Sequence, residues 1–352
     1  MALPINPPYP PMEALLVETI PTGQEWQYEP KWDGFRCLAF KDGKNVELQS
    51  KSGQSLGRYF PKLISALQQI KAKKFVLDGE IVIPVQESFS FDDLLQRIHP
   101  AESRIRKLSQ EYPANILAFD LLVSAEGKLL AGQPLKERRR LLEIFFARYL
   151  AHDSTVQLSP VTRQINLAPT WLEMAGGKLD GLVAKRLDLT YQSGERTGIQ
   201  KVKRLRTADC VVGGFRYASE RRAVGSLLLG LYDDGLLHHV GFTSSFSQQE
   251  KKALLQKLKP LIEPPGFTGN APGGPSRWST QRSAEWQPLK PKLIVEVQYD
   301  HFTGNRFRHG TRFLRWRPDK SPKSCLMSQV TGSVQAVEAE TLEMAVRSTG
   351  KR

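Results

Sequence analysis

The sequence of 352 residues predicts an α+β fold with two domains. Over residues 1–207, runs with strand character alternate with helical patterns, as expected for antiparallel sheets covered by helices. From residue 208 the pattern changes to short strands separated by turns, which is typical of a small β-barrel. We therefore expect domains at residues 1–207 and 208–327, followed by a polar tail over residues 328–352.

The strands of the first domain are predicted from aromatic and β-branched runs. The first run must bend where Asp33-Gly34 interrupts it, and Asp42-Gly43 marks a hairpin turn after it. Two later runs also contain an acidic residue next to a glycine, Asp78-Gly79-Glu80 and Asp180-Gly181. The predicted strands cover residues 25–40, 46–50, 75–83, 116–123, 180–185 and 201–203.

Helices in the first domain are predicted where apolar residues recur at helical spacing. Pro61 suits the first turn of one helix, and Ser90 is expected to cap a second. Further helices are predicted over residues 134–150 and around Trp171. Residues 1–24 contain several prolines and are expected to lie over the core without a regular element.

The second domain is predicted to consist mainly of strands, with one helix over residues 248–261 and a long loop over residues 263–288. The loop is expected because prolines and glycines are frequent there. The predicted strands cover residues 210–215, 226–232, 236–242, 293–299 and 311–317.

The composition predicts a cytoplasmic protein. No apolar run approaches the roughly 20 residues that a membrane helix needs, and the proline-rich N-terminus has no signal-peptide pattern. Three widely spaced cysteines, Cys37, Cys210 and Cys325, form neither a disulfide framework nor a zinc signature. We expect them to be reduced thiols.

The formal charge of +14 indicates a polyanionic partner, and nucleic acid is the commonest such partner of an intracellular protein. The charge is +6 for residues 1–208 and +8 for the shorter remainder, so the second domain is the more basic. A basic surface without a partner is the alternative interpretation.

Five charged residues stand on or beside predicted strands of the first domain, where they can converge on one cleft: Lys31, Glu80, Asp180, Lys201 and Lys203. Taken alone, Lys31 before a turn is more often a solvated charge. A cleft with this mixture of acids and lysines is costly to bury without a purpose. Nucleotide phosphate with Mg²⁺ explains it, because acids hold the metal while lysines neutralise phosphate oxygens. Neighbouring cations and desolvation would depress the pKa of Lys31 and make it a nucleophile.

The order of these segments resembles that of the covalent nucleotidyltransferases, and within them the ATP-dependent DNA ligases. Lys31-Trp32-Asp33-Gly34-Phe35-Arg36 matches the nucleophile motif of the family. Asp78-Gly79-Glu80 resembles the motif whose glutamate binds the ribose, and Phe119-Asp120-Leu121-Leu122 resembles the segment whose aromatic ring stacks on adenine. The resemblance covers nearly all of residues 25–325 and implies an adenylation domain followed by an OB-fold barrel.

Three further segments are similar to the motifs of this family. Asp180-Gly181-Leu182-Val183-Ala184-Lys185 resembles the metal-binding motif, and Lys201-Val202-Lys203 resembles the phosphate-binding lysines. Arg315 with Arg317-Pro318-Asp319-Lys320 resembles the motif on the OB domain. Because pyrophosphate leaves only in the first step, this last motif is expected to serve self-adenylylation and to require closure of the second domain over the cleft.

The resemblance implies a role for individual residues, with Lys31 as the catalytic nucleophile that takes AMP from ATP. Nucleotide contacts are implied for Glu29, Arg36, Lys51, Glu80, Phe119, Lys185, Lys201, Lys203, Arg315, Asp319 and Lys320. The metal, Mg²⁺ or Mn²⁺, is expected on Asp33, Glu80 and Asp180. DNA contacts are expected from basic residues of the second domain, Arg216, Arg221, Arg222, Arg306, Arg308 and Arg312.

Three positions depart from the family pattern. Lys51-Ser52-Gly53 stands where many ligases have arginine followed by Asn-Gly, Asp180 stands where most have glutamate, and Ile199-Gln200 replace a common aromatic residue. Lys51 supplies charge but not the bidentate phosphate contact of an arginine. The shorter Asp180 carboxylate is expected to alter metal affinity.

The second domain most resembles that of bacterial ligase C, chiefly in residues 210–215, 225–235 and 299–316. The resemblance implies that a monomer seals nicks with 3′-hydroxyl and 5′-phosphate ends, in DNA repair at the bacterial nucleoid, with repair proteins as further partners. An mRNA-capping guanylyltransferase or an RNA ligase is the alternative within the superfamily. A catalytically silent nucleic-acid-binding protein is the alternative from another class.

Overall fold

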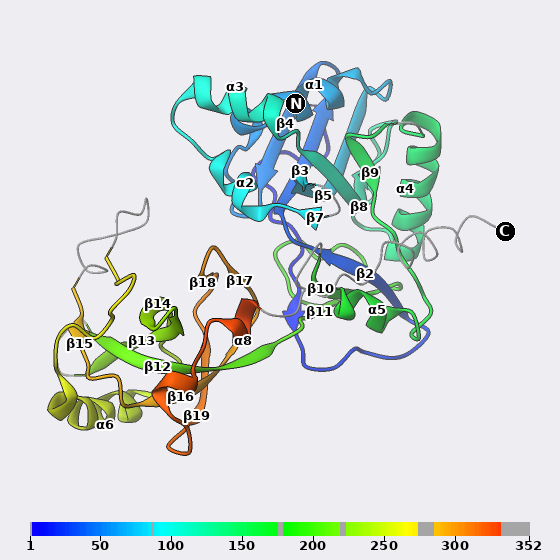
Figure 1. Cartoon of the computed structure of the whole chain (residues 1–352). Coiled ribbons are helices and arrows are strands. Elements are labelled where there is room, and N and C mark those ends of the chain that lie inside the picture. Colours follow the sequence, from blue (N-terminus) through cyan, green and yellow to red (C-terminus); the bar gives the residue numbers. More distant parts are fainter. Residues whose placement is uncertain are drawn as a thin grey trace. The chain divides into compact units, whose positions relative to one another are not determined.

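The computed structural model describes residues 2–85, 88–151, 153–174, 179–218, 223–273 and 285–331. These residues form two compact units, residues 2–204 and residues 205–331, whereas the predicted boundary followed residue 207 (Figure 1). No helix in the described ranges has both the length and the apolar character needed to cross a membrane.

The first unit contains one sheet, here called the β3 sheet, with the strand order β4-β3-β5-β8-β9. Its strands are β3 (Phe35–Asp42), β4 (Asn45–Ser50), β5 (Lys74–Val82), β8 (Asn115–Val123) and β9 (Val156–Leu158). Two helices cover it, α1 (Pro61–Gln69) against β4 and α4 (Leu135–Tyr149) against β8 (Figure 1). Leu63 and Leu142 on their apolar faces are buried and contribute to the core.

A further sheet of this unit, the β2 sheet, has the strand order β1-β11-β10-β2. Its strands are β1 (Leu15–Leu16), β2 (Trp26–Trp32), β10 (Leu179–Arg186) and β11 (Ile199–Val202). The short helix α5 (Ala168–Glu173) packs against β10 and β2 through Trp171. The structure therefore places the predicted strand at 180–185 beside the first half of the run at 25–40, and the predicted strand at 201–203 on the other side of it.

The predicted bend at Asp33-Gly34 carries the chain from the β2 sheet to the β3 sheet. A side chain at Gly34 would collide with the backbone carbonyl oxygen of Ile81 and approach Glu80 Cγ to 2.9 Å. Glycine is required here because the neighbouring strand β5 leaves no room for a Cβ atom. The bend leaves Lys31 on one sheet and Arg36 on the other.

Several smaller elements complete the first unit. The predicted cap of α2 (Phe91–Gln96) is present, since the Asp93 backbone N–H donates to Ser90 Oγ at 3.2 Å. A helix at α3 (Glu102–Glu111) was not predicted, because it is mostly polar and buries few apolar residues. The remaining elements are β6 (Pro84–Val85), β7 (Ser88–Phe89) and η1 (Gly57–Tyr59).

The second unit contains a sheet with the strand order β14-β13-β12-β16-β19, to which β15 adds beside β12. The strands are β12 (Arg206–Tyr217), β13 (Val224–Asp233), β14 (Leu236–Thr243), β15 (Gln287–Pro288), β16 (Ile294–Tyr299) and β19 (Arg312–Trp316). All five predicted strands are present. Within the described ranges, however, no strand ladder joins β14 to β19, and an isolated bridge pairs Thr243 with Thr311, which precedes β19, so the sheet does not close into the expected barrel.

The helices of the second unit are short. The predicted helix at 248–261 consists of α6 (Gln248–Leu258) followed by η2 (Lys259–Leu261), and Ser247 forms a capping box with Glu250. The hairpin of β17 (Phe302–Thr303) and β18 (Arg306–Phe307) was not predicted, because each of its strands has only two residues. The elements η3 (Pro322–Ser324) and α8 (Ser328–Thr331) follow the sheet, and residues 332–352 of the predicted tail lie outside the described residues.

The three cysteines are free and buried. Burial raises the pKa of the Cys325 thiol to about 11, and burial likewise raises the pKa values of Cys37 and Cys210. Their thiols therefore contribute to the core as small apolar groups.

Candidate active site

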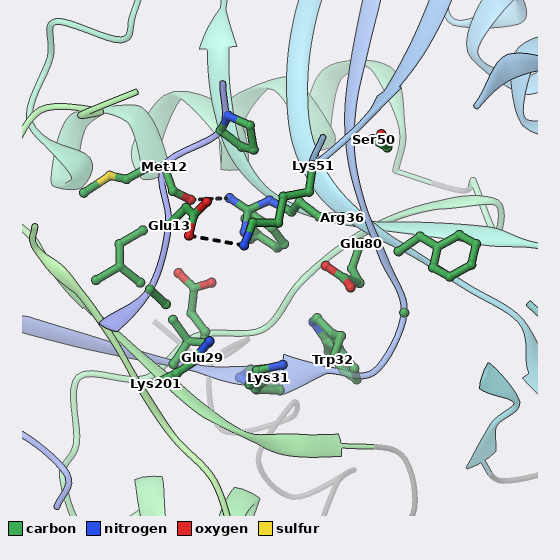
Figure 2. Close-up of a pocket in the computed structure, with 18 of the residues that line it drawn as sticks. Met12, Glu13, Glu29, Lys31, Trp32, Arg36, Ser50, Lys51, Glu80 and Lys201 are labelled. Carbon is green, nitrogen blue, oxygen red and sulfur yellow. Dashed lines mark hydrogen bonds and ion pairs between the residues drawn. The ribbon is translucent and has the colours of Figure 1, made fainter. Parts of the chain in front are cut away.

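A cavity of about 770 Å³ lies in the first unit and is lined from both of its large sheets (Figure 2). Its volume falls within the range of small-molecule sites. The residues that line it include the predicted nucleophile Lys31 and most of the predicted nucleotide contacts of the first domain, namely Glu29, Arg36, Lys51, Glu80, Phe119, Lys185 and Lys201.

Lys31 stands near the end of β2, and its ammonium group forms an ion pair with the carboxylate of Asp180 on β10. Asp180 is 7% exposed, and its Oδ2 also lies 3.1 Å from Lys203 Nζ. The ladder between β10 and β2 is irregular between Leu179 and Gly181, where φ of Gly181 is +135°. A side chain at Gly181 would collide with the carbonyl oxygen of Val202. Glycine therefore permits the bulge from which Asp180 reaches Lys31.

Positive charge is concentrated around Lys31. Burial lowers the pKa of Lys201, and the charges of Lys31, Lys203 and Lys51 lower it further. Such mutual repulsion between ammonium groups is relieved when an anion enters between them. The cavity is thus suited electrostatically to a polyphosphate.

Arg36 is held in the cavity wall by the buried carboxylate of Asp78. Its Nε and Nη2 atoms donate to Asp78 at 2.5 and 2.7 Å, and the Tyr191 hydroxyl donates to the same carboxylate at 2.7 Å. Burial disfavours the guanidinium charge, but Asp78 outweighs this effect and raises the pKa of Arg36 above its ordinary value. The bidentate pair therefore fixes the orientation of Arg36.

Phe119 lies beneath two cations. The Arg36 guanidinium carbon is 4.5 Å, and Lys185 Nζ is 4.2 Å, from the centroid of its ring. Lys185 in turn forms a 2.7 Å ion pair with Glu29, whose carboxylate also accepts from Gln27 at 2.8 Å. The structure thus brings three predicted contacts of the nucleotide, Glu29, Phe119 and Lys185, into one corner of the cavity.

Glu80 projects into the cavity from β5 (Figure 2). Burial raises the pKa of its carboxyl to about 7, although the positive charges of Lys31 and Arg36 oppose the rise. A cation in the cavity would favour the ionised form of this group. Glu80 is thereby able to change its charge when a ligand binds.

The predicted metal ligands are not gathered in one cluster. Within the part of the chain that the structure describes, no group of three or more His, Cys, Asp or Glu residues is arranged to hold a metal ion. Mg²⁺ commonly uses one or two carboxylates together with water and phosphate oxygens. Glu80 and Asp180, both beside Lys31, fit that requirement, and the charge of Asp33 also acts on the carboxyl of Glu80.

The predicted OB-domain motif forms an ion-pair network inside the second unit. Arg315 Nε lies 2.5 Å from Glu296, and Arg317 lies 3.0 Å from Asp209 and 2.7 Å from Asp319. The ammonium group of Lys320 also contacts Asp209.

Comparison with known proteins assigns the chain to a family. The family model described as "ATP dependent DNA ligase domain" matches residues 11–203, and "ATP dependent DNA ligase C terminal region" matches residues 220–320. The chain belongs to the ATP-dependent DNA ligases. The resemblance proposed from the sequence motifs is therefore confirmed.

Relatives of this ligase include DNA ligase C2 of Mycolicibacterium smegmatis, with 43% identity over 94% of this chain and 96% of the relative. DNA ligase C of Mycobacterium tuberculosis is 41% identical over the same fractions. A structure from a study of Lig E DNA ligases covers 87% of this chain and 100% of its own, with a TM-score of 0.53 and 18% identity, and supports the fold alone. The predicted α+β fold class with two ligase domains, the enzyme class and the likeness to ligase C are confirmed, although the sheet of the second unit is not closed within the described residues.

The four predicted DNA contacts that fall within the described residues lie in the second unit of the ligase. Burial lowers the pKa of Arg216 on β12, and the charge of Arg306 on β18 lowers it further, so these two cations lie near each other. Arg312 begins β19 and is exposed, and the backbone N–H of Arg308 donates to the His301 carbonyl at 3.0 Å. Arg221 and Arg222 lie outside the described residues.

Several residues of the site were not identified from the sequence. Asp78 was visible in the Asp78-Gly79-Glu80 motif but was given no role, although it anchors Arg36. Glu13, Tyr191 and Arg196 carried no signal, because the contacts of Tyr191 with Met12 and Asp78, and of Arg196 with Glu13, join segments 113 to 183 residues apart. Such contacts follow from the path of the chain and not from a local pattern.

We expect Glu80→Gln to stabilise the nucleotide-free ligase more at pH 8 than at pH 5. The folded-state pKa of Glu80 is about 7 against an ordinary value of 4.5, so its favourable contribution is complete below pH 4.5 and is lost as the pH rises through 7. Removing the charge in Glu80→Gln should therefore raise the free energy of unfolding by about 1–3 kcal/mol at pH 8. Melting temperatures at both pH values test this expectation.

Glu47→Gln on β4 removes a carboxylate from the same sheet outside the cavity, and it controls for the change of net charge. A stabilisation by Glu80→Gln that is equal at pH 5 and pH 8 would contradict the assigned pKa.

Proposed function

We propose that this ligase seals nicks in double-stranded DNA through an AMP group carried on Lys31. The observation that carries the proposal is the position of Lys31, which adjoins a cavity of suitable volume and is surrounded by lysines. Lys201, Lys203 and Lys51 supply the positive charge that an incoming triphosphate needs.

The proposed reaction comprises three displacements at phosphorus. Lys31 Nζ attacks the α-phosphorus of ATP, forming an N–P bond while the bond to pyrophosphate breaks. The 5′-phosphate at the nick then displaces the lysine and takes AMP. The 3′-hydroxyl finally attacks that 5′-phosphorus and releases AMP. Each displacement depends mainly on charge neutralisation and in-line positioning.

Asp180 is the group placed to act on the Lys31 amine. It contacts the ammonium group directly, so it can hold Lys31 in position and accept the proton lost before attack. Its second contact, with Lys203, limits the directions in which it can move.

We assign the adenine base to the corner formed by Phe119, Lys185 and Glu29, and the ribose to Glu80. A divalent metal, Mg²⁺ or Mn²⁺, fits beside Glu80 and Asp180 because both offer carboxylate oxygens. When bound, it would neutralise phosphate charge. That Asp33 is a further metal ligand remains a prediction. We also predict that the chain acts as a monomer and cooperates with repair proteins.

We expect Lys31→Ala and Lys31→Arg to abolish covalent labelling by ATP. Alanine lacks the amine, and arginine cannot readily supply a neutral nitrogen. The measurement is incubation with α-labelled ATP and Mg²⁺, followed by denaturation and detection of label on the protein. Lys44→Ala, in the exposed turn between β3 and β4, should label normally.

Label that persists in Lys31→Ala would refute the assignment of the nucleophile. Label from GTP in place of ATP would indicate a capping enzyme, and no label in the unaltered protein would indicate a binding module.

We infer that Arg216, Arg306, Arg308 and Arg312 contact DNA phosphates. If so, Arg306→Ala should weaken binding to nicked DNA and reduce the slope of log affinity against log salt by about 1. Titration of labelled nicked duplex at several salt concentrations measures that slope. Lys252→Ala on α6 removes one charge from the same unit, and an equal change of slope in both variants would reject the assignment.

We assign Arg315 to the first step, because only that step releases pyrophosphate. Its pair with Glu296 is largely exposed, with 65% of the Arg315 side chain accessible, so it costs little to open. Arg315→Ala should slow self-adenylylation about tenfold or more and leave sealing of a pre-adenylylated nick within about threefold.

Single-turnover rates of both steps provide the measurement for Arg315. Arg312→Ala on the same strand should instead affect nick binding. Equal losses of both steps in Arg315→Ala would contradict a role confined to the first step.

A further inference from the structure

Residues 9–17 form a segment, here called the N-terminal strap, that is joined to both large sheets of the first unit. At one end, the Tyr9 N–H donates to Gln49 Oε1 at 2.8 Å, and Gln49 Nε2 donates back to the Tyr9 carbonyl at 2.7 Å. At the other end, β1 pairs with β11, and the Val17 N–H donates to the Lys201 carbonyl at 3.0 Å. The strap therefore connects the β3 sheet to the β2 sheet.

The middle of the strap forms a wall of the cavity. Its residues 11–14 all line the cavity, and the backbone of Met12 is held on both sides. The Met12 N–H donates to the Tyr191 hydroxyl at 2.9 Å. Arg36 Nη2 donates to the Met12 carbonyl at 3.5 Å, as Figure 2 shows. The network that orients Arg36 thus also fixes the strap.

Glu13 is the charged residue that this wall presents. Its Oε2 atom lies 3.2 Å from Lys51 Nζ and 3.1 Å from Arg196 Nε, and these contacts lower the pKa of the carboxyl. Figure 2 shows Glu13 and Lys51 meeting on one side of the cavity, while Lys31 and Lys201 lie on the opposite side. The carboxylate of Glu13 therefore lies between the cations of Lys51 and Arg196. A phosphate oxygen would suit the same position.

We propose that Glu13 is a positioning residue that acts through Lys51 and sets the affinity of the ligase for ATP. In the nucleotide-free protein it neutralises Lys51 and Arg196. An entering triphosphate must draw Lys51 away from Glu13, against the repulsion of the remaining carboxylate. This inference rests on the proposed reaction of Lys31 with ATP.

The exposure of the pair makes such an exchange possible. The Lys51 side chain is 59% exposed and that of Arg196 is 67% exposed, whereas Glu13 is 26% exposed. Exposed ion pairs are weak and screened by salt, so a ligand with several negative charges can displace one partner. The less exposed carboxylate stays with the strap, because the Glu13 backbone N–H donates to the Glu195 carbonyl at 2.7 Å.

We expect Glu13→Gln to lower KM for ATP in self-adenylylation about three- to fivefold, with kcat changed less than about twofold. A fivefold change corresponds to about 1 kcal/mol, and it should shrink at high salt. Lys51→Ala should raise KM, and in the Lys51→Ala background Glu13→Gln should lose most of its effect.

Two variants control for charge and structure. Glu18→Gln removes an exposed carboxylate just beyond the strap and outside the cavity, and it should leave KM unchanged. Glu13→Asp keeps the charge and should restore a KM nearer that of the unaltered protein. A KM that is unchanged or raised in Glu13→Gln would overturn the proposal, as would an equal decrease in Glu18→Gln.

ATP binding to a protein with Lys31→Ala separates this inference from the proposed function. Calorimetry should show a lower Kd for Lys31→Ala with Glu13→Gln than for Lys31→Ala alone. An unchanged Kd would overturn the role of Glu13, whether or not Lys31 is the nucleophile. Covalent labelling of Lys31→Ala would refute the nucleophile while leaving the comparison of Kd values interpretable.

Discussion

The close approach of Gly34 to the carbonyl oxygen of Ile81 is the constraint on which the architecture of the site depends. A Cβ atom does not fit there, and glycine, which has none, therefore lets the chain turn sharply from the β2 sheet into the β3 sheet. The turn places Lys31 and Arg36, only five positions apart, on different sheets that line one cavity. A single short motif thereby contributes residues from both sheets.

The charges of the cavity are arranged around this turn. Asp78 holds Arg36, Glu29 holds Lys185, and Asp180 holds Lys31, so most of the acids serve as fixed partners of cations. Such pairs are favourable inside a protein only when their geometry is good and their remaining hydrogen bonds are satisfied. Glu80 differs, because burial dominates its surroundings and raises its pKa to about 7. Glu80 is thus a carboxyl group whose charge can respond to a ligand, beside carboxylates that are held in ion pairs.

Local patterns predicted much of this structure. The bend at Asp33-Gly34, the cap at Ser90 and the strands of both units follow from short-range chemistry, and the structure reproduces them. The order of the motifs was sufficient to identify the family. The polar helix α3 and the two-residue strands β17 and β18 escaped prediction because their sequences lack a clear periodicity.

The contacts of Glu13, Asp78 and Tyr191 could not be predicted, because they depend on how distant segments cross. Asp78 and Tyr191 are 113 positions apart, and no sequence pattern around either residue indicates that they are in contact. The unclosed sheet of the second unit also depends on the bends of its strands, which alternation of apolar residues does not encode.

The burial of all three cysteines has a practical consequence for work on this ligase. A thiol must be exposed and ionised to react with a maleimide, and Cys37, Cys210 and Cys325 are neither at neutral pH. A cysteine introduced at an exposed position would therefore take up a fluorophore selectively, without prior removal of the natural thiols. Spectroscopic labels can therefore be placed at single chosen positions of this chain.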